Sequence, residues 1–464
     1  MRAHSIPIKY ILLAGAVAAL CTGCASLPRD TERPQARPLG AEYETIGRKT
    51  DATMTAASGA DMATTDAITL EQALALTLMR NPELETFSHA VLAAEARYDQ
   101  SKRLPNPKIK VGVSEVDRTG EGFDAAEIEV VLGQKLELGG KRGWRARVAE
   151  AKGELAGWDY ESKRLDVFTE TAQRFTEVIA AQRRLELAKS AESLAEQTSE
   201  AVGERVKAGK EPPVQATKAV AELGMARLSV LEAENGLAVS RTKLAVMWES
   251  EQPHFQKVGG DFDDVLAALP SLEILRLHLS SNPDVARGHV ELKLRQAALA
   301  AEKAARVPDL EASIGLQRFE EDGTDSLAFG IGVPLPLFDR NQGNIAAAKH
   351  ELARAEAARR AAESALATEL ANEHATLRSA QGRALTLRSK VVPAMEEAFA
   401  AVREGYSQGK FGFLDMLDAQ RGLLKARGAL VDALTDYHVA VAGIQRIMGT
   451  SIEELLENEV RASE

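Results

Sequence analysis

Cysteine and aromatic residues are scarce in this sequence, and its N-terminal apolar run is too short to cross a membrane. Only two of the 464 residues are cysteines, Cys21 and Cys24, so the chain beyond them has no disulfide and no thiol nucleophile. Aromatic residues make up 5% of the chain, and much of its 45% hydrophobic content is alanine and leucine, which favour helices. The apolar run at residues 11–20 is well short of the roughly 20 residues that a bilayer requires.

An excess of basic charge and the patterns of a catalytic or metal site are also lacking. The formal net charge of −11 argues against a general nucleic-acid binder. No Gly-rich phosphate loop follows a strand and no nucleophile elbow occurs, so the sequence predicts neither an enzyme nor a cofactor. The methionines are scattered, and no two histidines have the close spacing of a ligand pair, so no metal site is predicted. The histidines are His4, His89, His254, His278, His289, His350, His374 and His438.

The first 24 residues have the pattern of a secretory signal. Arg2 and Lys9 flank the start of the apolar run, and small residues lead to Cys24. We predict a signal peptide at 1–24, with Cys24 as the lipidated first residue of the mature chain; the alternative is cleavage without lipid. Ala25 resembles a signal for sorting to the outer membrane, so we expect a lipid-anchored protein of the cell outer membrane.

Two copies of one unit make up most of the chain. AVREGYSQGK at 401–410 aligns without a gap on AVGERVKAGK at 201–210, an offset of 200 residues, and Asn282-Pro283 matches Asn81-Pro82 at an offset of 201. An internal repeat of this length decides the fold, because each copy must form the same elements. Residues 25–66 are rich in Pro, Thr, Ala, Asp and Gly and have no apolar periodicity, which predicts a flexible tether. The predicted organisation is this tether, a first repeat at 67–262, a second repeat at 263–450 and a C-terminal tail at 451–464.

Each repeat has two segments of strict apolar alternation. In the first repeat the regions are Lys108 to Val116 and Glu127 to Leu138, and in the second they are Leu310 to Gln317 and Leu327 to Leu337. Alternation with a period of two predicts strands with one apolar face and one polar or small face. The sequence therefore predicts four amphipathic strands per chain, two in each repeat.

Long helical patterns flank these strands. Thr69 and Gln72 resemble a capping box, Asn81-Pro82 predicts the end of one helix and the start of the next, and Pro393 predicts a kink. The longest pattern spans nearly 70 residues, or about 100 Å. The predicted helices are 70–80, 82–103, 139–207, 213–248, 342–407 and 412–448.

Four strands cannot close a barrel, and an open sheet edge in lipid leaves backbone groups unpaired at a cost of several kcal/mol each. Self-association removes the edges, and three copies give twelve strands, a reasonable number for an outer-membrane barrel. Helices that continue the strands then form a tube. The competing interpretation is a soluble antiparallel coiled coil with small β-hairpins at one end.

The chain resembles the TolC-like outer-membrane efflux proteins over about residues 67 to 448. The resemblance rests on the two-fold repeat together with the order of several motifs. These motifs are Asn81-Pro82-Glu83-Leu84, Pro105-Asn106-Pro107, Leu138-Gly139-Gly140-Lys141-Arg142, the run Pro336 to Gly343, and Gly405-Tyr406-Ser407-x-Gly409 leading to Leu414-Asp415-x-Leu417-Asp418-Ala419.

This resemblance implies a mainly α fold with a small β part. It would be a homotrimeric β-barrel with four strands per chain, continued by an antiparallel α-helical coiled-coil tunnel. It also implies contact with outer-membrane lipid, a periplasmic adaptor protein and an inner-membrane resistance-nodulation-division pump. The segments around residues 139–142 and 336–344 look most like the CzcC branch, which implies export of divalent cations such as cobalt, zinc and cadmium. The alternatives are a channel of the same type for drugs or other small molecules, and a non-conducting periplasmic coiled-coil lipoprotein.

The turn at 403–420 is the strongest candidate site. Asp415 and Asp418 are three residues apart and so share one helical face, which in a trimer places six carboxylates near the axis. The resemblance places a gate or selectivity ring at these two aspartates, with Tyr406 as a hydrogen-bonding group across the closed tip. The simpler interpretation is that both aspartates favour the N-terminal dipole of the last helix. In the first repeat the position that corresponds to Asp415 is occupied by Gln215.

The two Gly-Lys turns are the predicted periplasmic tips. Gly209 and Lys210 form the first, and Gly409 and Lys410 form the second. The resemblance makes them candidate contacts for the adaptor protein. The simpler interpretation is ordinary helix-hairpin chemistry, in which glycine ends the helix.

Overall fold

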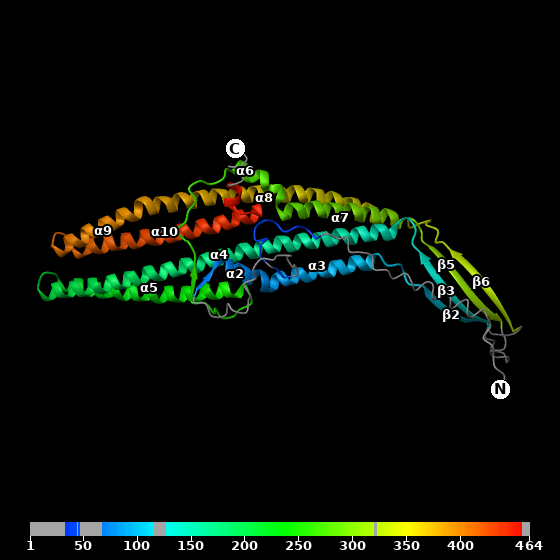
Figure 1. The fold of residues 1–464 in the computed structure, drawn as a ribbon, viewed down its shortest axis with the longest axis horizontal. Helices are drawn as coiled ribbons and strands as arrows, with labels where there is room; N and C mark the ends of the chain where they lie inside the picture. The colour runs from blue at the N-terminus through cyan, green and yellow to red at the C-terminus, as the bar shows by residue number, and fades with distance from the viewer. Residues whose placement is uncertain (1–32, 44, 47–66, 115–126, 320–322, 457–464) are drawn as a thin grey trace, which may run out of the picture. The chain divides into compact units, whose positions relative to one another are not determined.

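The computed structural model describes residues 33–43, 45–46, 67–114, 127–319 and 323–456. The predicted signal peptide and Cys24 lie outside the described residues. All elements below belong to one unit, residues 34–464 (Figure 1).

Both repeats begin with helices that an Asn-Pro pair separates. Helix α2 (Leu70–Arg80) starts at the predicted capping box, in which Thr69 and Gln72 exchange bonds of 3.3 and 3.0 Å. Helix α3 (Pro82–Ser101) follows Asn81, whose side-chain oxygen accepts from the Leu84 N–H at 3.0 Å. In the second repeat, α6 (Leu272–His278) and a short 3-10 turn precede α7 (Pro283–Ala305). The predicted break at each Asn-Pro pair is confirmed.

The side chains of the two asparagines also form long-range hydrogen bonds that their sequence position does not indicate. Asn81 Nδ2 donates to the Met247 carbonyl at 2.8 Å, and Asn282 Nδ2 donates to the Ile447 carbonyl at 2.8 Å. Both asparagines are buried. Each one therefore connects the start of its repeat to the end of the same repeat, some 165 residues later.

The remaining helices form two long hairpins. The first consists of α4 (Lys141–Lys207) and α5 (Pro213–Val246). The second consists of α8 (Gln342–Thr386), a π-helical turn (Leu387–Val391), α9 (Val392–Ser407) and α10 (Phe413–Met448). The disturbance predicted at Pro393 thus takes the form of a π turn that ends two residues before the proline, a common response to an interrupted helical ladder.

Four strands form one antiparallel sheet in the order β2-β3-β5-β6. They are β2 (Lys108–Ser114), β3 (Glu127–Leu136), β5 (Leu310–Phe319) and β6 (Thr324–Gly332). The central ladder, β3 with β5, joins the two repeats over ten residue pairs. Strands β2 and β6 are the edges.

The strand predicted to run to Leu337 ends earlier, at Gly332. The reason is chemical, because Pro334 and Pro336 have no N–H to donate to a ladder. The strand predicted to run to Leu138 likewise ends at Leu136. The predicted alternation itself is confirmed, because the register aligns the apolar positions of all four strands on one face.

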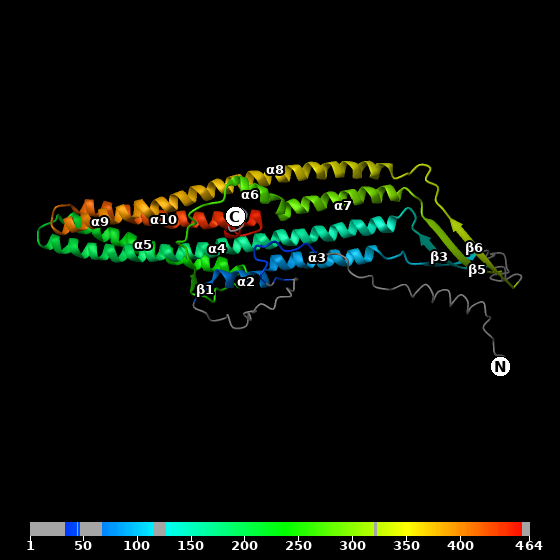
Figure 2. The ribbon, with the colours of Figure 1, turned by 45° about the horizontal axis from the view of Figure 1, so that its top comes forward.

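The helices form a layer that continues from the sheet. In the half beside the sheet, α3, α4, α7 and α8 lie in that order, and in the far half α5, α4, α10 and α9 do so (Figures 1 and 2). The turns of the two hairpins lie at the end remote from the sheet (Figure 1). No helix among the described residues is both long and apolar enough to cross a bilayer.

Part of the predicted tether is ordered. Residues 34–43 and 45–46, here called the strap, pack on α4 around an ion pair of Arg164 and Glu161 whose side chains are 0% and 2% exposed. Arg164 donates to the carbonyls of Leu39 at 2.8 Å and Arg37 at 3.1 Å. Glu161 accepts from the Arg37 N–H at 2.5 Å. The prediction of a flexible tether is therefore wrong for the strap, because a buried pair satisfies its backbone groups.

The strap and the segment after α10 both pack on the helices. The Leu39 N–H donates to the Gly449 carbonyl at 2.9 Å, and the Ile46 N–H donates to the Leu78 carbonyl at 3.2 Å. Ile452 and Leu455 are buried in an apolar cluster with α8 and α10, so the predicted tail is packed up to residue 456. A short parallel pair, β1 (Ala67–Thr69) with β4 (Lys257–Gly259), was not predicted.

Candidate functional site

The hairpin turns have the geometry that their glycines predict. Gly209 has a φ of +66° and Gly409 a φ of +74°, the left-handed region that favours glycine. The Lys210 N–H donates to the Arg205 carbonyl at 2.9 Å, and the Lys410 N–H donates to the Gly405 carbonyl at 2.8 Å. These bonds close each helix in the usual glycine-capped way. Both lysine side chains are exposed, and a contact with an adaptor stays a prediction.

Asp415 and Asp418 lie in the first turns of α10 and are both exposed. Asp415 Oδ2 accepts from the Gly412 N–H at 2.9 Å, so this carboxylate caps the helix. Met416 and Leu417 between them are buried, which leaves the two carboxylates on the free face. A single chain thus shows the capping role of Asp415 and leaves the predicted ring untested.

Tyr406 points into the contact between the two hairpins of its own chain. Its side chain is 5% exposed, and the Arg205 guanidinium lies 4.8 Å from its ring centre. Among the described residues, no group forms a hydrogen bond with its Oη. Burial, together with the nearby Glu211 carboxylate, raises the pKa of Tyr406, although Arg205 opposes the shift. Within this chain the tyrosine ring supports Arg205 from the first hairpin, and a hydrogen bond across the closed tip stays a prediction.

The tip contact that sequence reasoning missed is apolar and spans both hairpins. Tyr406, Phe413, Met416 and Leu423 of the second hairpin pack with Val202 of the first. Phe411 covers Gly405 so closely that a Cβ there would lie 2.3 Å from its ring. A signal that could have found it is the spacing of Phe413, Met416 and Leu423, which indicates one packed face of a helix but does not say what packs on it.

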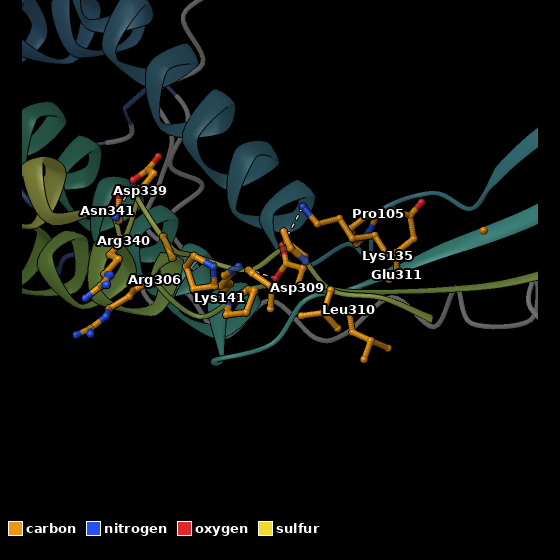
Figure 3. Close-up of a pocket in the computed structure, with 18 of the residues that line it drawn as sticks. Pro105, Lys135, Lys141, Arg306, Asp309, Leu310, Glu311, Asp339, Arg340 and Asn341 are labelled. Carbon is orange, nitrogen blue, oxygen red and sulfur yellow. Dashed lines mark hydrogen bonds and ion pairs between the residues drawn. The ribbon is translucent and has the colours of Figure 1, made fainter. Parts of the chain in front are cut away.

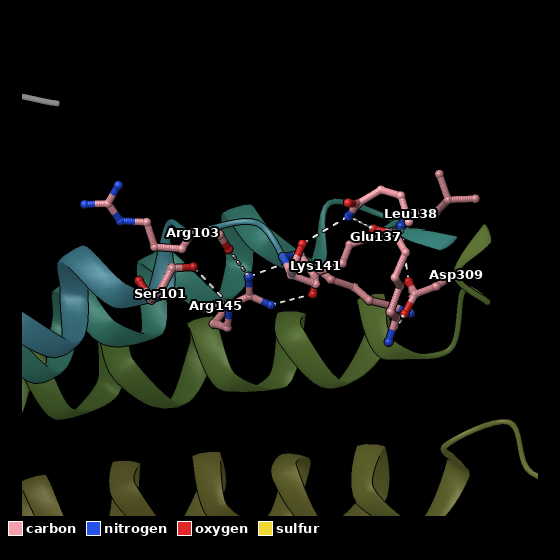
Figure 4. Close-up of polar contacts among 10 residues, drawn as sticks. Ser101, Arg103, Glu137, Leu138, Lys141, Arg145 and Asp309 are labelled. Atoms are coloured by element: carbon pink, nitrogen blue, oxygen red, sulfur yellow. Dashed lines mark hydrogen bonds and ion pairs between the residues drawn. The ribbon is translucent and has the colours of Figure 1, made fainter. Parts of the chain in front are cut away.

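A second polar cluster, also missed, lies where the sheet meets the helices (Figure 4). Asp309, just before β5, accepts from Lys141 at 2.6 Å and from the Leu138 N–H at 3.2 Å, and it pairs with Lys135 at 2.9 Å. Burial alone would raise the pKa of Asp309, but these bonds outweigh it and lower the pKa to about 2. One carboxylate of the second repeat thereby holds two lysines of the first.

Arg145 makes a neighbouring cluster at the same junction (Figure 4). It binds both carboxylate oxygens of Glu137 at 2.6 and 3.0 Å, and it donates to the carbonyls of Ser101 at 3.0 Å and Arg103 at 3.2 Å. Bidentate pairs of this kind fix orientation as well as distance. The pKa of Glu137 is lowered, chiefly by its hydrogen bond from Arg145. The start of α4 is therefore attached to the strand before it and to the end of α3.

An open pocket of about 810 Å³ lies beside this junction (Figure 3). Its lining combines the starts of β2 and β5 with the segment between β6 and α8. The charged side chains of the lining are Lys108, Lys135, Lys141, Arg306, Asp309, Glu311, Asp339 and Arg340. Among the described residues, no group of three or more His, Cys, Asp or Glu side chains is arranged to hold a metal ion.

The fold and its two ends define an outer-membrane efflux protein. A profile of the outer membrane efflux protein family matches residues 73–248 and 274–450, and the chain belongs to this family. The resemblance to it is therefore confirmed. The family and the structural relatives are channel proteins.

Two curated relatives are heavy-metal resistance proteins of Cupriavidus metallidurans. The chain is 34% identical over 382 residues to the cobalt-zinc-cadmium resistance protein CzcC. The aligned region covers 82% of this chain and 90% of CzcC. It is 27% identical over 291 residues to the nickel and cobalt resistance protein CnrC, covering 62% of this chain and 67% of CnrC. Among solved structures, the open state of the MtrE outer membrane channel of Neisseria gonorrhoeae has a TM-score of 0.70 at 20% identity, covering 91% of this chain and 98% of MtrE.

Proposed function

We propose that three copies of this chain form a closed β-barrel in the outer membrane, continued by a helical tunnel in the periplasm. The observation that carries the proposal is the apolar face of the sheet. Ile109 is 71% exposed, Phe329 74% and Ile331 77%, although the strands that hold them are regular. A face of this kind needs lipid or another apolar surface against it. The unpaired edges β2 and β6 need partners for the same reason, because open edges are not tolerated in lipid.

Closure by three copies makes a specific structural prediction. The β6 edge of one copy would pair with the β2 edge of the next, so cysteines on the two edges come within disulfide range. We expect the variant carrying Ile331→Cys and Ile109→Cys, or a neighbouring pair in the same two strands, to cross-link into trimers in outer membranes. The variant with Ile331→Cys alone is the control. Monomers only, with every edge pair tried, would contradict the barrel.

The cargo that we propose is divalent heavy-metal cations. Support comes from the 34% identity to CzcC, a cobalt-zinc-cadmium resistance protein. We further propose that a resistance-nodulation-division pump and a periplasmic adaptor deliver the cations, with the Gly209-Lys210 and Gly409-Lys410 tips as adaptor contacts. Lipidation of Cys24 would anchor the chain.

A strain that lacks this chain tests the cargo. Loss of tolerance to cobalt, zinc and cadmium, restored by the intact gene, is the expected result. Increased sensitivity to drugs with unchanged metal tolerance would favour a drug-type channel. If purified protein gives no conductance in planar bilayers, the non-conducting lipoprotein interpretation would replace both.

At the tip we propose that Asp415 and Asp418 form a ring that favours cations. Acidic rings select cations in channels, and both carboxylates lie on the exposed face of α10. Replacing Asp418 with Asn removes charge without touching the helix cap that Asp415 provides. We expect weaker cation selectivity in bilayers; an unchanged reversal potential in a salt gradient would remove Asp418 from the ring.

A further inference from the structure

The polar face of the sheet separates its charges by position along the strands. Lys108 and Lys110 lie at the end of β2 near the helices, and Glu127 and Glu129 lie at the far end of β3. Glu129 pairs in register with Gly112 on one side and Gln317 on the other. Glu127 occupies the next such level outward, beside Ser114 and Phe319. Within the described strands, no basic side chain occupies this face at those two levels.

The pocket beside the junction adds to the basic end (Figure 3). Its lining has five basic side chains against three carboxylates. Two of the five, Lys135 and Lys141, are already bound by Asp309. The remaining charged side chains of the lining are Lys108, Arg306 and Arg340 against Glu311 and Asp339, which leaves an excess of positive charge. The pocket opens on the polar face, because Lys108 pairs in register with Gly133, another lining residue.

We propose that the channel lumen is bipolar. A basic collar, Lys108, Lys110, Arg306 and Arg340, lies where the barrel meets the tunnel, and an acidic mouth, Glu127 and Glu129, lies at the far end. This inference rests on the proposed function, since the polar face becomes the lumen only if the apolar face meets lipid. A trimer repeats each set three times around the axis.

When a basic region and an acidic region follow each other along a channel, the ionic current depends on the direction of the voltage. The collar attracts anions and the mouth attracts cations. A voltage that drives cations from the mouth toward the collar fills the lumen with both kinds of ion, and the opposite voltage empties it. The channel should therefore rectify current. A cationic cargo must pass the basic collar before it reaches the acidic mouth, so the collar is the barrier that a pump has to overcome.

The experiment is current recording in planar bilayers with purified full-length protein. In 0.1 M KCl, where the Debye length is about 10 Å, we expect unequal currents at opposite voltages; in 1 M KCl, where it is about 3 Å, the inequality should disappear. The double variant Lys108→Gln with Lys110→Gln should reduce rectification and shift the reversal potential toward cation preference. Glu127→Gln with Glu129→Gln should reduce rectification and shift the reversal potential the other way.

Charge-preserving variants separate charge from structure. The double variant Lys108→Arg with Lys110→Arg should show the same rectification as the unchanged protein. A purely structural role of the two lysines would not require this result. Symmetric currents at low salt, or shifts of the same sign in both double variants, would overturn the bipolar lumen while leaving the channel itself intact. A complete absence of conductance would instead contradict the proposed function, and this inference with it.

Discussion

The two repeats of this chain agree at their Asn-Pro junctions and differ at both ends of their long helices. Asn81 and Asn282 make matching bonds to carbonyls near the ends of their own repeats. At the same offset of 201 residues, however, Lys108 stands where Asp309 does. The buried asparagine is the same in both repeats, whereas the residue at the start of the sheet is a lysine in the first repeat and an aspartate in the second.

The tips differ in a related way. Asp415 in the second repeat corresponds to Gln215 in the first, at an offset of 200. The capping bond of Asp415 also needs the Gly412 N–H, and the corresponding residue in the first tip is Pro212, which has none. An aspartate at 215 would therefore have no equivalent bond to make. The two tips therefore differ at two coupled positions: an aspartate at 415 occurs with a glycine at 412, and a glutamine at 215 occurs with a proline at 212.

The largest effect is expected where the repeats agree. Replacing Asn81 or Asn282 with Ala removes a helix cap and leaves a buried carbonyl without its donor, which should cost about 2–4 kcal/mol in either repeat. Thermal unfolding followed by circular dichroism measures this loss, with the exposed Asn372→Ala as control. A large effect in only one repeat would show that the two junctions are not equivalent.

An intermediate effect is expected at Asp309, where the repeats carry opposite charge. Its pKa is lowered to about 2 from the ordinary 3.8, so the folded state prefers the ionised carboxylate. The stabilisation is present above about pH 4 and is lost as the pH falls toward 2. Because the carboxylate borders an open pocket, solvent screening limits the gain to about 1–2 kcal/mol.

The matching variant is Asp309→Asn. It should be less stable than the unchanged protein at pH 7 and should lose less stability between pH 4 and pH 2.5. Denaturant titrations at the three pH values measure both differences. An identical pH dependence in the two proteins would show that Lys135 and Lys141 do not hold this carboxylate.

The smallest effect is expected at the tips. Asp415→Ala should cost about 1 kcal/mol through the lost cap, whereas Gln215→Ala should change stability by less than about 0.5 kcal/mol. The reciprocal change Gln215→Asp should bring no gain, because Pro212 offers no N–H. Thermal midpoints of the three variants decide this, and a clear stabilisation by Gln215→Asp would contradict the role assigned to Pro212.

Local signals were enough for most of the elements. The alternation in β2 and β3, the capping box at Thr69 and the Gly-Lys turns depend on neighbouring residues, so periodicity and turn chemistry predicted them. The strand ending at Gly332 was predicted too long because the alternation continued through Pro334, where backbone chemistry stops the ladder.

Long-range polar contacts were beyond prediction. The bond from Asn81 to the Met247 carbonyl joins residues 166 positions apart, and nothing in either local sequence indicates the other. The Asp309 cluster also joins the two repeats across the sheet end. The strap was misjudged for a similar reason, because its stability comes from α4 and not from its own composition.

The strap has a mechanical consequence. The strap is tied to the helices by bonds to Arg164, Glu161 and Gly449. A force that entered the strap at its first residues would therefore load these bonds before it reached β1 or the sheet. The helix layer, and not the first strand, would carry the tension of any attachment made upstream.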